Sequence, residues 1–111
     1  MQLRRIQRLA ETIREELEEI VNYELDDPRI GSVVVVEVIL SRDGRKALAR
    51  VEAAGSETEA EAALAALDHA RRYVRRLLAA RLELFHSPEV LFEPAAGSAA
   101  GFGRRGRAGA V

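Results

Sequence analysis

Residues 24–40 read ELDDPRIGSVVVVEVIL, in which a proline-containing turn leads directly into a run of β-branched residues. Pro28 disfavours helical geometry at the residue before it and cannot donate a backbone hydrogen bond. Residues 33–40 are β-branched almost throughout, which favours a strand. Their lack of clean alternation between apolar and polar side chains indicates burial on much of both faces. We therefore expect a helix that stops near Asp26, a turn, and then the central strand of a sheet.

A periodic apolar pattern precedes this turn. Its members recur at spacings of three and four, as on one face of a helix. They are Ile6, Leu9, Ile13, Leu17, Ile20 and Val21. The pattern predicts one amphipathic helix from about Leu3 to Leu25. Arginines occupy its first turns and glutamates its later turns, an order that opposes the helix macrodipole, so packing of the apolar face must supply most of its stability.

Two strand signals flank a turn signal further along the chain. Asp43 and Gly44 form a residue pair typical of a hairpin turn between the β-branched run and a second strand. The second strand covers residues 46–53, where alternate side chains point to one face. The face that we expect to point inward carries Ala47, Ala49, Val51 and Ala53. Side chains this small leave room for a closely packed helix.

The next segment predicts either one helix or two. Ser56 and Glu59 match a capping box, in which each side chain satisfies a backbone amide of the other residue, so a helix starts directly after Ser56. No Gly or Pro interrupts residues 57–84, and either one long helix or a kinked pair fits. Pro88 breaks the pattern, and residues 90–92 are typical of a short third strand. The predicted order is α-β-β-α-α-β, an α+β domain with its helices packed on one face of a three-stranded sheet.

The composition places the chain among single-domain globular proteins. It has 111 residues, of which 48% are apolar and 32% charged, and a formal net charge of −1. No apolar run approaches the roughly 20 residues that cross a bilayer, and there is no secretory hydrophobic region, so we expect a cytoplasmic protein without membrane contact. With no cysteine and two separated histidines, we predict no metal site. No nucleophile–base pair or nucleotide loop is recognisable, which favours a protein that is not an enzyme and uses no cofactor.

Residues 94–111 differ from the rest of the chain because they are rich in Ala, Gly and Arg. They hold too few apolar side chains to offset the cost of ordering a chain, roughly 1 to 2 kcal/mol per residue, so we expect a flexible tail. Two roles fit a basic tail: weak, salt-sensitive affinity for a polyanion, or a solubilising terminus. The predicted folded domain is residues 1–93.

Arginines form the main candidate site. Four of them lie on one side of the helix expected around residues 69–82, opposite Val74 and Leu78. They are Arg71, Arg72, Arg75 and Arg76. Guanidinium groups suit phosphate oxygens, although a charged helix face can also be simply exposed to water. A second group surrounds the predicted hairpin and comprises Arg42, Arg45, Lys46 and Arg50. These side chains fit contact with a ligand and equally fit an ordinary polar hairpin tip. For Arg29 we favour a structural role, pairing with Asp26 at the helix end, over contact with a ligand.

Several of these segments, taken in order, resemble the ribosome-binding factor A family over about residues 4–93. They are the opening helix, the turn of residues 24–31, the valine-rich strand, Leu40-Ser41 with Asp43, and Leu64-Ala65-Ala66-Leu67 before Tyr73-Val74-Arg75. The resemblance implies a type II KH-like RNA-binding domain that binds the immature small ribosomal subunit. It further implies assistance in late maturation and processing of small-subunit rRNA without catalysis, and a ribosome-associated GTPase as a partner that promotes release.

Two positions depart from the pattern of that family. KH domains clamp the nucleic-acid backbone with a glycine-rich turn between two helices, and the family has a kink of the form Ala-x-Gly at that place. The matching residues are Ala70-Arg71-Arg72, so an arginine replaces the glycine. Leu48 stands where members of the family often carry a basic residue. The first difference adds a positive charge where a phosphate backbone would pass.

Two classes of function follow from these observations. The first is a non-enzymatic assembly factor, expected to be a monomer, that holds rRNA through arginine–phosphate contacts and shape. The second is a non-catalytic protein–protein adaptor or homodimer that uses the charged helix faces. In that case the acidic face of the first helix would pair with a basic helix of a partner.

Overall fold

The computed structural model describes residues 3–84 and 86–95. Its elements are α1 (Leu3–Glu19), a π-helical segment η1 (Ile20–Glu24), β1 (Val33–Leu40), β2 (Lys46–Ala53), α2 (Glu57–His69), α3 (Arg71–Leu82) and β3 (Glu89–Pro94). This order confirms the predicted α-β-β-α-α-β arrangement. Residues 96–111, for which the composition predicts a flexible tail, lie outside the described residues.

The three strands form one mixed sheet in the order β1-β2-β3. β1 and β2 are antiparallel, and β3 runs parallel to β2 on its other side. The central strand is therefore β2, and the prediction that the valine-rich strand is central is wrong. Val34, Val36 and Ile39 are 44% to 48% exposed, so the β-branched run reflects strand preference and not burial on both faces.

A β-bulge explains why the apolar pattern of β1 does not alternate cleanly. The register with β2 shifts between Val35 and Glu37, which places one extra residue in β1. Val33 and Val35 before the bulge are buried, as are Val38 and Leu40 after it. The bulge thus keeps both ends of the strand packed on the same core.

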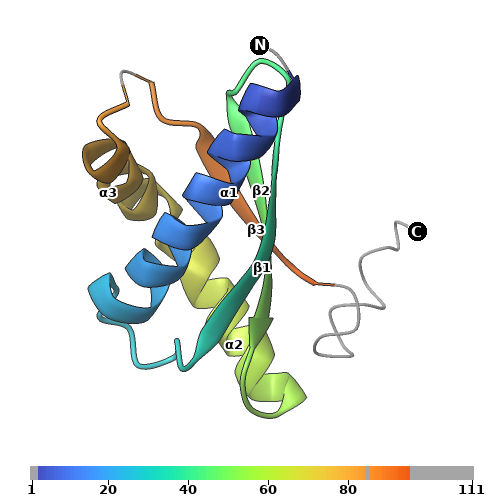
Figure 1. The fold of residues 1–111 in the computed structure, drawn as a ribbon. Helices are drawn as coiled ribbons and strands as arrows, with labels where there is room; N and C mark the ends of the chain where they lie inside the picture. Colours follow the sequence, from blue (N-terminus) through green and yellow to red (C-terminus); the bar gives the residue numbers. More distant parts are fainter. Residues whose placement is uncertain (1–2, 85, 96–111) are drawn as a thin grey trace.

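The helices cover one face of the sheet, as predicted, and among the described residues no helix covers the other face, which we call the open face (Figure 1). Side chains buried between the two layers come from every helix and strand, and they include Ile13, Leu17, Val21, Val35, Val51, Leu67, Val74 and Val90. Ala47 and Ala49 of β2 are completely buried, and their small side chains let the helices approach the middle of the sheet. Truncating a fully buried leucine such as Leu17 to alanine would lower the free energy of unfolding by about 2 to 5 kcal/mol.

Polar side chains of the first helix close the free edge of β1. Asn22 Nδ2 donates to Val33 O at 2.8 Å, and Asn22 Oδ1 accepts from Val33 N–H at 3.1 Å. Next along the edge, Val35 N–H donates to Glu18 Oε1 at 2.8 Å, and Arg14 donates to Val35 O at 3.2 Å. An unpaired strand edge is a template for association with other strands, so these contacts protect the first part of the β1 edge, at Val33 and Val35.

The first helix departs from the expectation of one regular helix to Leu25. Its last turn, Ile20–Glu24, is π-helical and so is wider than an α-helical turn. Ile20 and Val21 are both buried in it. Asn22 also donates to Glu18 O at 2.9 Å, which holds its amide in place against the strand edge.

Residues 57–84 contain two helices, so the kinked-pair alternative holds. The predicted capping box starts α2: Glu59 N–H donates to Ser56 Oγ at 3.1 Å, and Ser56 N–H donates to Glu59 Oε1 at 2.8 Å. Ala70 separates α2 from α3 with φ −90° and ψ 3°. Most residue types adopt this conformation, as in common turns, so the break needs no glycine and Arg72 lies inside α3.

Candidate nucleic-acid interface

The turn between β1 and β2 is held in one shape by its own side chains. The Ser41 hydroxyl donates to Asp43 Oδ1 at 2.7 Å, and Arg45 N–H donates to the same oxygen at 3.0 Å. These two hydrogen bonds lower the pKa of Asp43, which therefore stays ionised. Gly44 has a φ of 74°, a left-handed conformation that glycine adopts without strain. The exposed basic side chains that project from this fixed support are Arg42, Arg45 and Lys46.

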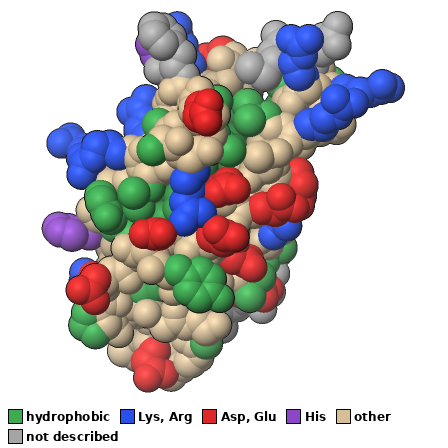
Figure 2. Space-filling view, turned by 60° about the vertical axis from the view of Figure 1, so that its left-hand side comes forward, with side chains coloured by type: hydrophobic (Ala, Val, Ile, Leu, Met, Phe, Trp, Pro, Cys, Tyr) green, Lys and Arg blue, Asp and Glu red, His purple; other side chains and the backbone are tan. Residues whose placement is uncertain are grey.

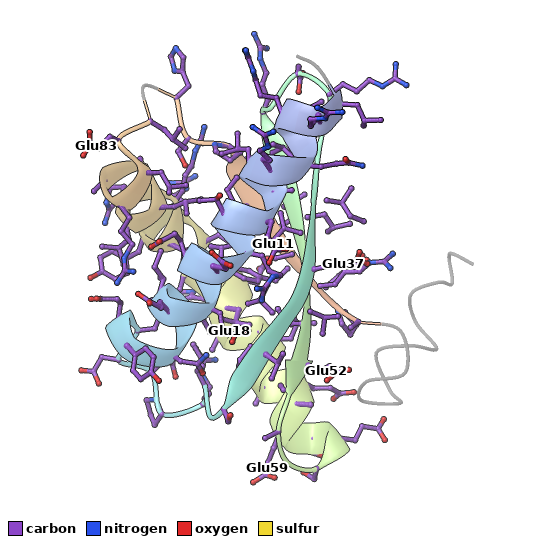
Figure 3. All side chains as sticks on the ribbon, in the orientation of Figure 1. Glu11, Glu18, Glu37, Glu52, Glu59 and Glu83 are labelled. Atoms are coloured by element: carbon purple, nitrogen blue, oxygen red, sulfur yellow. The ribbon has the colours of Figure 1, made fainter. Side chains whose placement is uncertain are left out.

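The first turns of α1 lie beside the hairpin turn (Figure 1). They carry three exposed arginines, Arg4, Arg5 and Arg8. Figure 3 shows nitrogen-ended side chains around the start of α1 and the hairpin turn, whereas the labelled Glu59 lies at the opposite end of the molecule. We call Arg4, Arg5, Arg8, Arg42, Arg45 and Lys46 the basic end. Sequence reasoning missed its first three members as site residues, because no local pattern connects the start of the chain with the hairpin.

A hollow of about 610 Å³ connects the basic end with α3. Arg45 and Lys46 line it from the hairpin, and Leu9 lines it from α1. Arg75 lines it from α3. The structure therefore brings together Arg45 and Lys46 of the hairpin group and Arg75 of the helix group, whereas the other predicted site residues do not line this hollow.

Two of the four α3 arginines that the sequence singles out also hold the fold together. Arg75 donates to Ser87 O through Nε at 3.0 Å and Nη2 at 2.8 Å, which ties α3 to the segment before β3. Arg71 pairs with Asp68 at 3.1 Å and with Glu89 at 3.7 Å. Both arginines still line a second hollow of about 330 Å³ beside β3.

The other two α3 arginines face solvent. The guanidinium carbon of Arg76 lies 5.6 Å from the centre of the Tyr73 ring, a cation–π contact. Arg72 lines the smaller hollow, and within the part of the chain that the structure describes its guanidinium forms no ion pair or hydrogen bond. Arg72 and Arg76 are therefore the arginines of α3 that a ligand can engage with the least rearrangement.

Arg50 is separated from the other predicted site residues. It pairs with Glu93 at 2.8 Å and with Glu37 at 3.3 Å, its direct neighbours in register on β3 and β1. Its neighbours along β2, Ala49 and Val51, point into the core, and Figure 3 shows Glu37 on the open side of the sheet. Arg50 thus links three strands across the open face and does not join the basic end.

Arg29 has a structural contact, with Asp27 as its partner and not the expected Asp26. Its Nε donates to Asp27 Oδ1 at 3.1 Å and its Nη2 to Asp27 Oδ2 at 2.8 Å. The backbone N–H of Arg29 also donates to Oδ1, at 2.9 Å. The hydrogen bonds from the guanidinium, and then that from the backbone, lower the pKa of Asp27 to about 2. The pair fixes the turn that leads into β1.

Arg81, near the end of α3, is enclosed by acidic side chains of the first helix and η1. Its guanidinium nitrogens lie 2.7 Å from Glu19, 3.0 Å from Glu16 and 3.0 Å from Glu24. Figure 2, which brings the α3 side of the molecule forward, shows acidic side chains gathered near the middle of this face. Hydrogen bonds to Glu19 and Glu16 raise the pKa of Arg81 above its usual value. Part of the acidic surface that an adaptor would present, namely Glu16, Glu19 and Glu24, thus pairs with the protein's own arginine.

Two further properties concern residues 3–84 and 86–95. In these ranges no group of three or more histidine, aspartate or glutamate side chains is placed to hold a metal ion. Nor does any helix there combine the length and the apolar composition that crossing a bilayer requires. The basic end and α3 remain the surface with the clearest chemical character.

Comparison with known protein families identifies the group to which this arrangement belongs. The family model described as ribosome-binding factor A matches residues 5–100. The chain belongs to the ribosome-binding factor A family. The ribosome-binding factor A of Solibacter usitatus is 47% identical to it over 93 residues, which are 84% of this chain and 76% of that protein.

Solved structures of ribosome-binding factor A share the fold. The crystal structure of the Thermus thermophilus protein matches with a TM-score of 0.70 and 34% identity, over 80% of this chain and 94% of that one. A homology model of the Thermus thermophilus factor, fitted into a cryo-EM map of a 30S complex with that factor, matches with a TM-score of 0.70 and 34% identity. The match covers 85% of this chain and 99% of that one. These matches confirm the resemblance drawn from the sequence and the KH-like α+β fold.

Within this ribosome-binding factor A fold, the connection between α2 and α3 shows how the chain accommodates Arg72. Ala70 N–H donates to Ala66 O at 3.0 Å and to Leu67 O at 3.1 Å, and Val74 N–H donates to Ala70 O at 2.9 Å. Backbone hydrogen bonds therefore hold Ala70 to the end of α2 and to the first turn of α3. The change of direction comes from Ala70, and the next positions are free to carry arginine.

Proposed function

We propose that this protein binds the immature small ribosomal subunit and assists late maturation and processing of its rRNA, without catalysis. Membership of the ribosome-binding factor A family supports this proposal. The fitted Thermus thermophilus neighbour supports it further, since that factor is described in a complex with the 30S subunit. The proposed contacts run from the basic end and the α3 arginines to rRNA phosphates, which position a protein without reading sequence.

One observation carries the choice of interface. The hollow places Arg45 and Lys46 of the hairpin next to Arg75 of α3, although the protein has a formal net charge of −1. A protein with this net charge does not attract RNA through its total field, so attraction has to come from a local concentration of cations. Arg50 is not part of the proposed interface, because Glu37 and Glu93 engage it.

The proposed activity is occupancy of rRNA. A bound protein keeps an immature rRNA conformation in place and has to leave before translation. The fixed hairpin and the anchored Arg75 suit this role, because donors that are positioned before binding lose little conformational freedom on binding. We assign release to a ribosome-associated GTPase.

We further propose that the protein acts as a monomer through the predicted domain of residues 1–93. Pro94 belongs to β3, and Ala95 N–H donates to Val51 O at 2.8 Å, so the domain includes these two residues as well. The hydrogen bonds of Asn22 to Val33 support a monomer, because they occupy the start of the β1 edge, where a second copy could otherwise pair. The tail beyond residue 95 is proposed to add salt-sensitive affinity of low specificity.

The test compares two double variants that lower the formal net charge by the same amount. Arg45→Gln with Lys46→Gln removes two positive charges from the basic end. Thr58→Glu with Ala65→Glu adds two negative charges at exposed positions of α2. Co-sedimentation with small ribosomal subunits at low salt should weaken about tenfold or more for the first pair and change little for the second, because the first pair alone loses phosphate contacts.

Three results would count against the proposal. Absence of binding by the unchanged protein at low salt would overturn the proposed function. An equal loss of subunit affinity in both double variants would show that affinity depends on net charge and not on the proposed interface. A stable dimer in light scattering that buries the arginines of α3 would favour the adaptor or homodimer alternative.

A further inference from the structure

The hollow between the basic end and α3 combines apolar walls with a cationic rim. Leu9, Leu84 and Pro88 supply apolar surface, and Arg45, Lys46 and Arg75 supply positive charge. A phosphate backbone alone needs cations and hydrogen-bond donors but no apolar wall. The apolar wall therefore calls for a ligand that also has an apolar, flat part.

We propose that this hollow takes the base of one unpaired rRNA nucleotide, with the adjoining phosphates held at the rim by Arg45 and Lys46. The inference rests on the proposed function and deepens it, because it adds a base-inserting subsite to contacts otherwise made with the backbone. At about 610 Å³ the hollow lies within the range of sites that enclose small organic ligands. Unpaired bases splayed out of loops are the usual targets when proteins contact RNA bases directly.

The charges at the rim favour this occupant. Asp43 and Glu89 also line the hollow, but the Asp43 carboxylate accepts from the Ser41 hydroxyl and from a backbone N–H, and Glu89 pairs with Arg71 at 3.7 Å. The side chains of Arg45 and Lys46 donate no hydrogen bond to any residue in the described part of the chain. Their donors are therefore available to a phosphate that enters the rim.

Two parts of the wall are held by hydrogen bonds within the protein itself. The hairpin is braced by the Ser41 and Asp43 hydrogen bonds, and Arg75 is anchored to Ser87 O by two of its nitrogens. Pro88 adds a rigid ring on the same side as Ser87. A preformed hollow selects a single nucleotide that is already extruded, whereas stacked bases in a duplex cannot enter it.

The experiment uses the full-length protein and two six-nucleotide probes. One probe is single-stranded RNA, and the other is the same ribose–phosphate chain without bases. Fluorescence anisotropy with the unchanged protein should show binding of the base-carrying probe about tenfold tighter, the size expected for contact with one base. Equal affinities for the two probes would overturn the inference, because they would show contact with the backbone alone.

A tryptophan reporter locates the base. The chain has no tryptophan, so Leu84→Trp places a single indole in the hollow. Ala62→Trp places one in a separate hollow of about 290 Å³ lined by Pro28 and Gly31, as a matched control. The base-carrying probe should change the emission of the Leu84→Trp variant and leave that of the control unchanged. Equal changes in both would overturn the location, and the anisotropy comparison stands even if a variant fails to fold.

Co-sedimentation with small subunits separates failure of this inference from failure of the proposed function. Subunit binding together with equal affinities for both probes would leave the proposed function standing and remove the base-inserting subsite. No subunit binding at low salt would remove the proposed function, and with it the assignment of the hollow to rRNA.

Discussion

Asp27 and Arg29 are joined by three hydrogen bonds in the turn before β1. The guanidinium and the backbone N–H of Arg29 both donate to the carboxylate, so the charged form of Asp27 is favoured. The pair is made within three consecutive residues, so it shapes the turn locally. Because folding lowers the pKa of Asp27, the free energy of unfolding that the pair contributes depends on pH.

We predict that this pair stabilises the protein above about pH 4 and ceases to do so near pH 2. The pKa of Asp27 falls from its usual 3.8 to about 2 on folding, so as the pH drops the unfolded chain takes up the proton first. Thermal unfolding of the protein and of Asp27→Asn, measured from pH 7 to pH 2, should show a difference in Tm that shrinks over the lower part of this range. A difference that stays constant down to pH 2 would contradict the assignment.

Arg72 and Arg81 lie on the same helix but have opposite tasks. Arg81 is held by three carboxylates of the first helix and η1, whereas the Arg72 guanidinium forms no ion pair or hydrogen bond with the described residues. A local sequence pattern shows that both are arginines on a helix. It does not show which of them has a partner, because the partners of Arg81 come from residues about sixty positions earlier in the chain.

Arg81→Met should therefore lower the free energy of unfolding by about 1 kcal/mol, since partly exposed ion pairs contribute little each but here form a network. Arg72→Ala should change the free energy of unfolding by less than about 0.5 kcal/mol. Urea unfolding of both variants measures this difference. For affinity to small subunits we expect the reverse: Arg72→Ala should weaken binding more than Arg81→Met. A larger loss of affinity in Arg81→Met, compared at equal folded fraction, would contradict the assignment of Arg72 to binding and Arg81 to stability.

At the scale of elements, β1 depends on its neighbours for more than core packing. Asn22 supplies one donor and one acceptor to Val33, as a neighbouring strand would. This places a side chain from the π-helical turn in the position of a missing fourth strand.

Asn22→Ala should lower the free energy of unfolding by about 1 to 3 kcal/mol, because both backbone groups of the buried Val33 lose their partners. It should also cause concentration-dependent self-association, detectable by light scattering, because the strand edge becomes free. Ser56→Ala is the control: it removes the cap of α2 at a cost of about 1 kcal/mol and leaves the edge closed. Self-association of both variants to the same degree would point to general destabilisation.

Local patterns were sufficient for the elements whose determinants lie close together in the chain. The bounds of β1 follow from its β-branched run, and the start of α2 follows from Ser56 and Glu59. The position of β1 at the sheet edge could not be predicted in this way, because it depends on which strand pairs with β3. The sequence gives one sign of the bulge, since Glu37 interrupts the β-branched run. The buried positions are odd-numbered before Glu37 and even-numbered after it.

The candidate site could be predicted only in part for the same reason. The hairpin and α3 arginines are visible as charge clusters in the sequence. Their meeting at one hollow, the membership of Arg4, Arg5 and Arg8, and the exclusion of Arg50 all depend on tertiary arrangement. Strand register places Arg50 beside Glu37 and Glu93, and register cannot be predicted from the spacing of charged residues.

At the scale of the whole molecule, positive charge is concentrated at one end. The basic end gathers around the start of α1, whereas the labelled Glu52 and Glu59 lie toward the other end and Glu83 lies beside α3 (Figure 3). A small net charge thus coexists with a strong local field, which favours approach to RNA in one orientation.

Affinity for the small subunit should fall steeply with salt, and the steepness should report the number of phosphates contacted. Removing the Arg45 and Lys46 charges should reduce the slope of log K against log salt concentration by about one for each lost contact. The Thr58→Glu and Ala65→Glu control should leave the slope unchanged. Filter binding over a series of salt concentrations measures both, and an unchanged slope in the first variant would exclude these two side chains from the interface.

The start of α3 has a further consequence. Its first turn contains no acidic residue and carries Arg71 and Arg72, although the amide groups exposed at a helix start favour negative charge. The free protein thus holds these cations against a local repulsion. Arg72→Glu should therefore raise the thermal stability of the free protein slightly while it weakens RNA binding, measurable as opposite changes in Tm and affinity. In the proposed interface, stability and binding compete at this position, and a bound phosphate would relieve the competition.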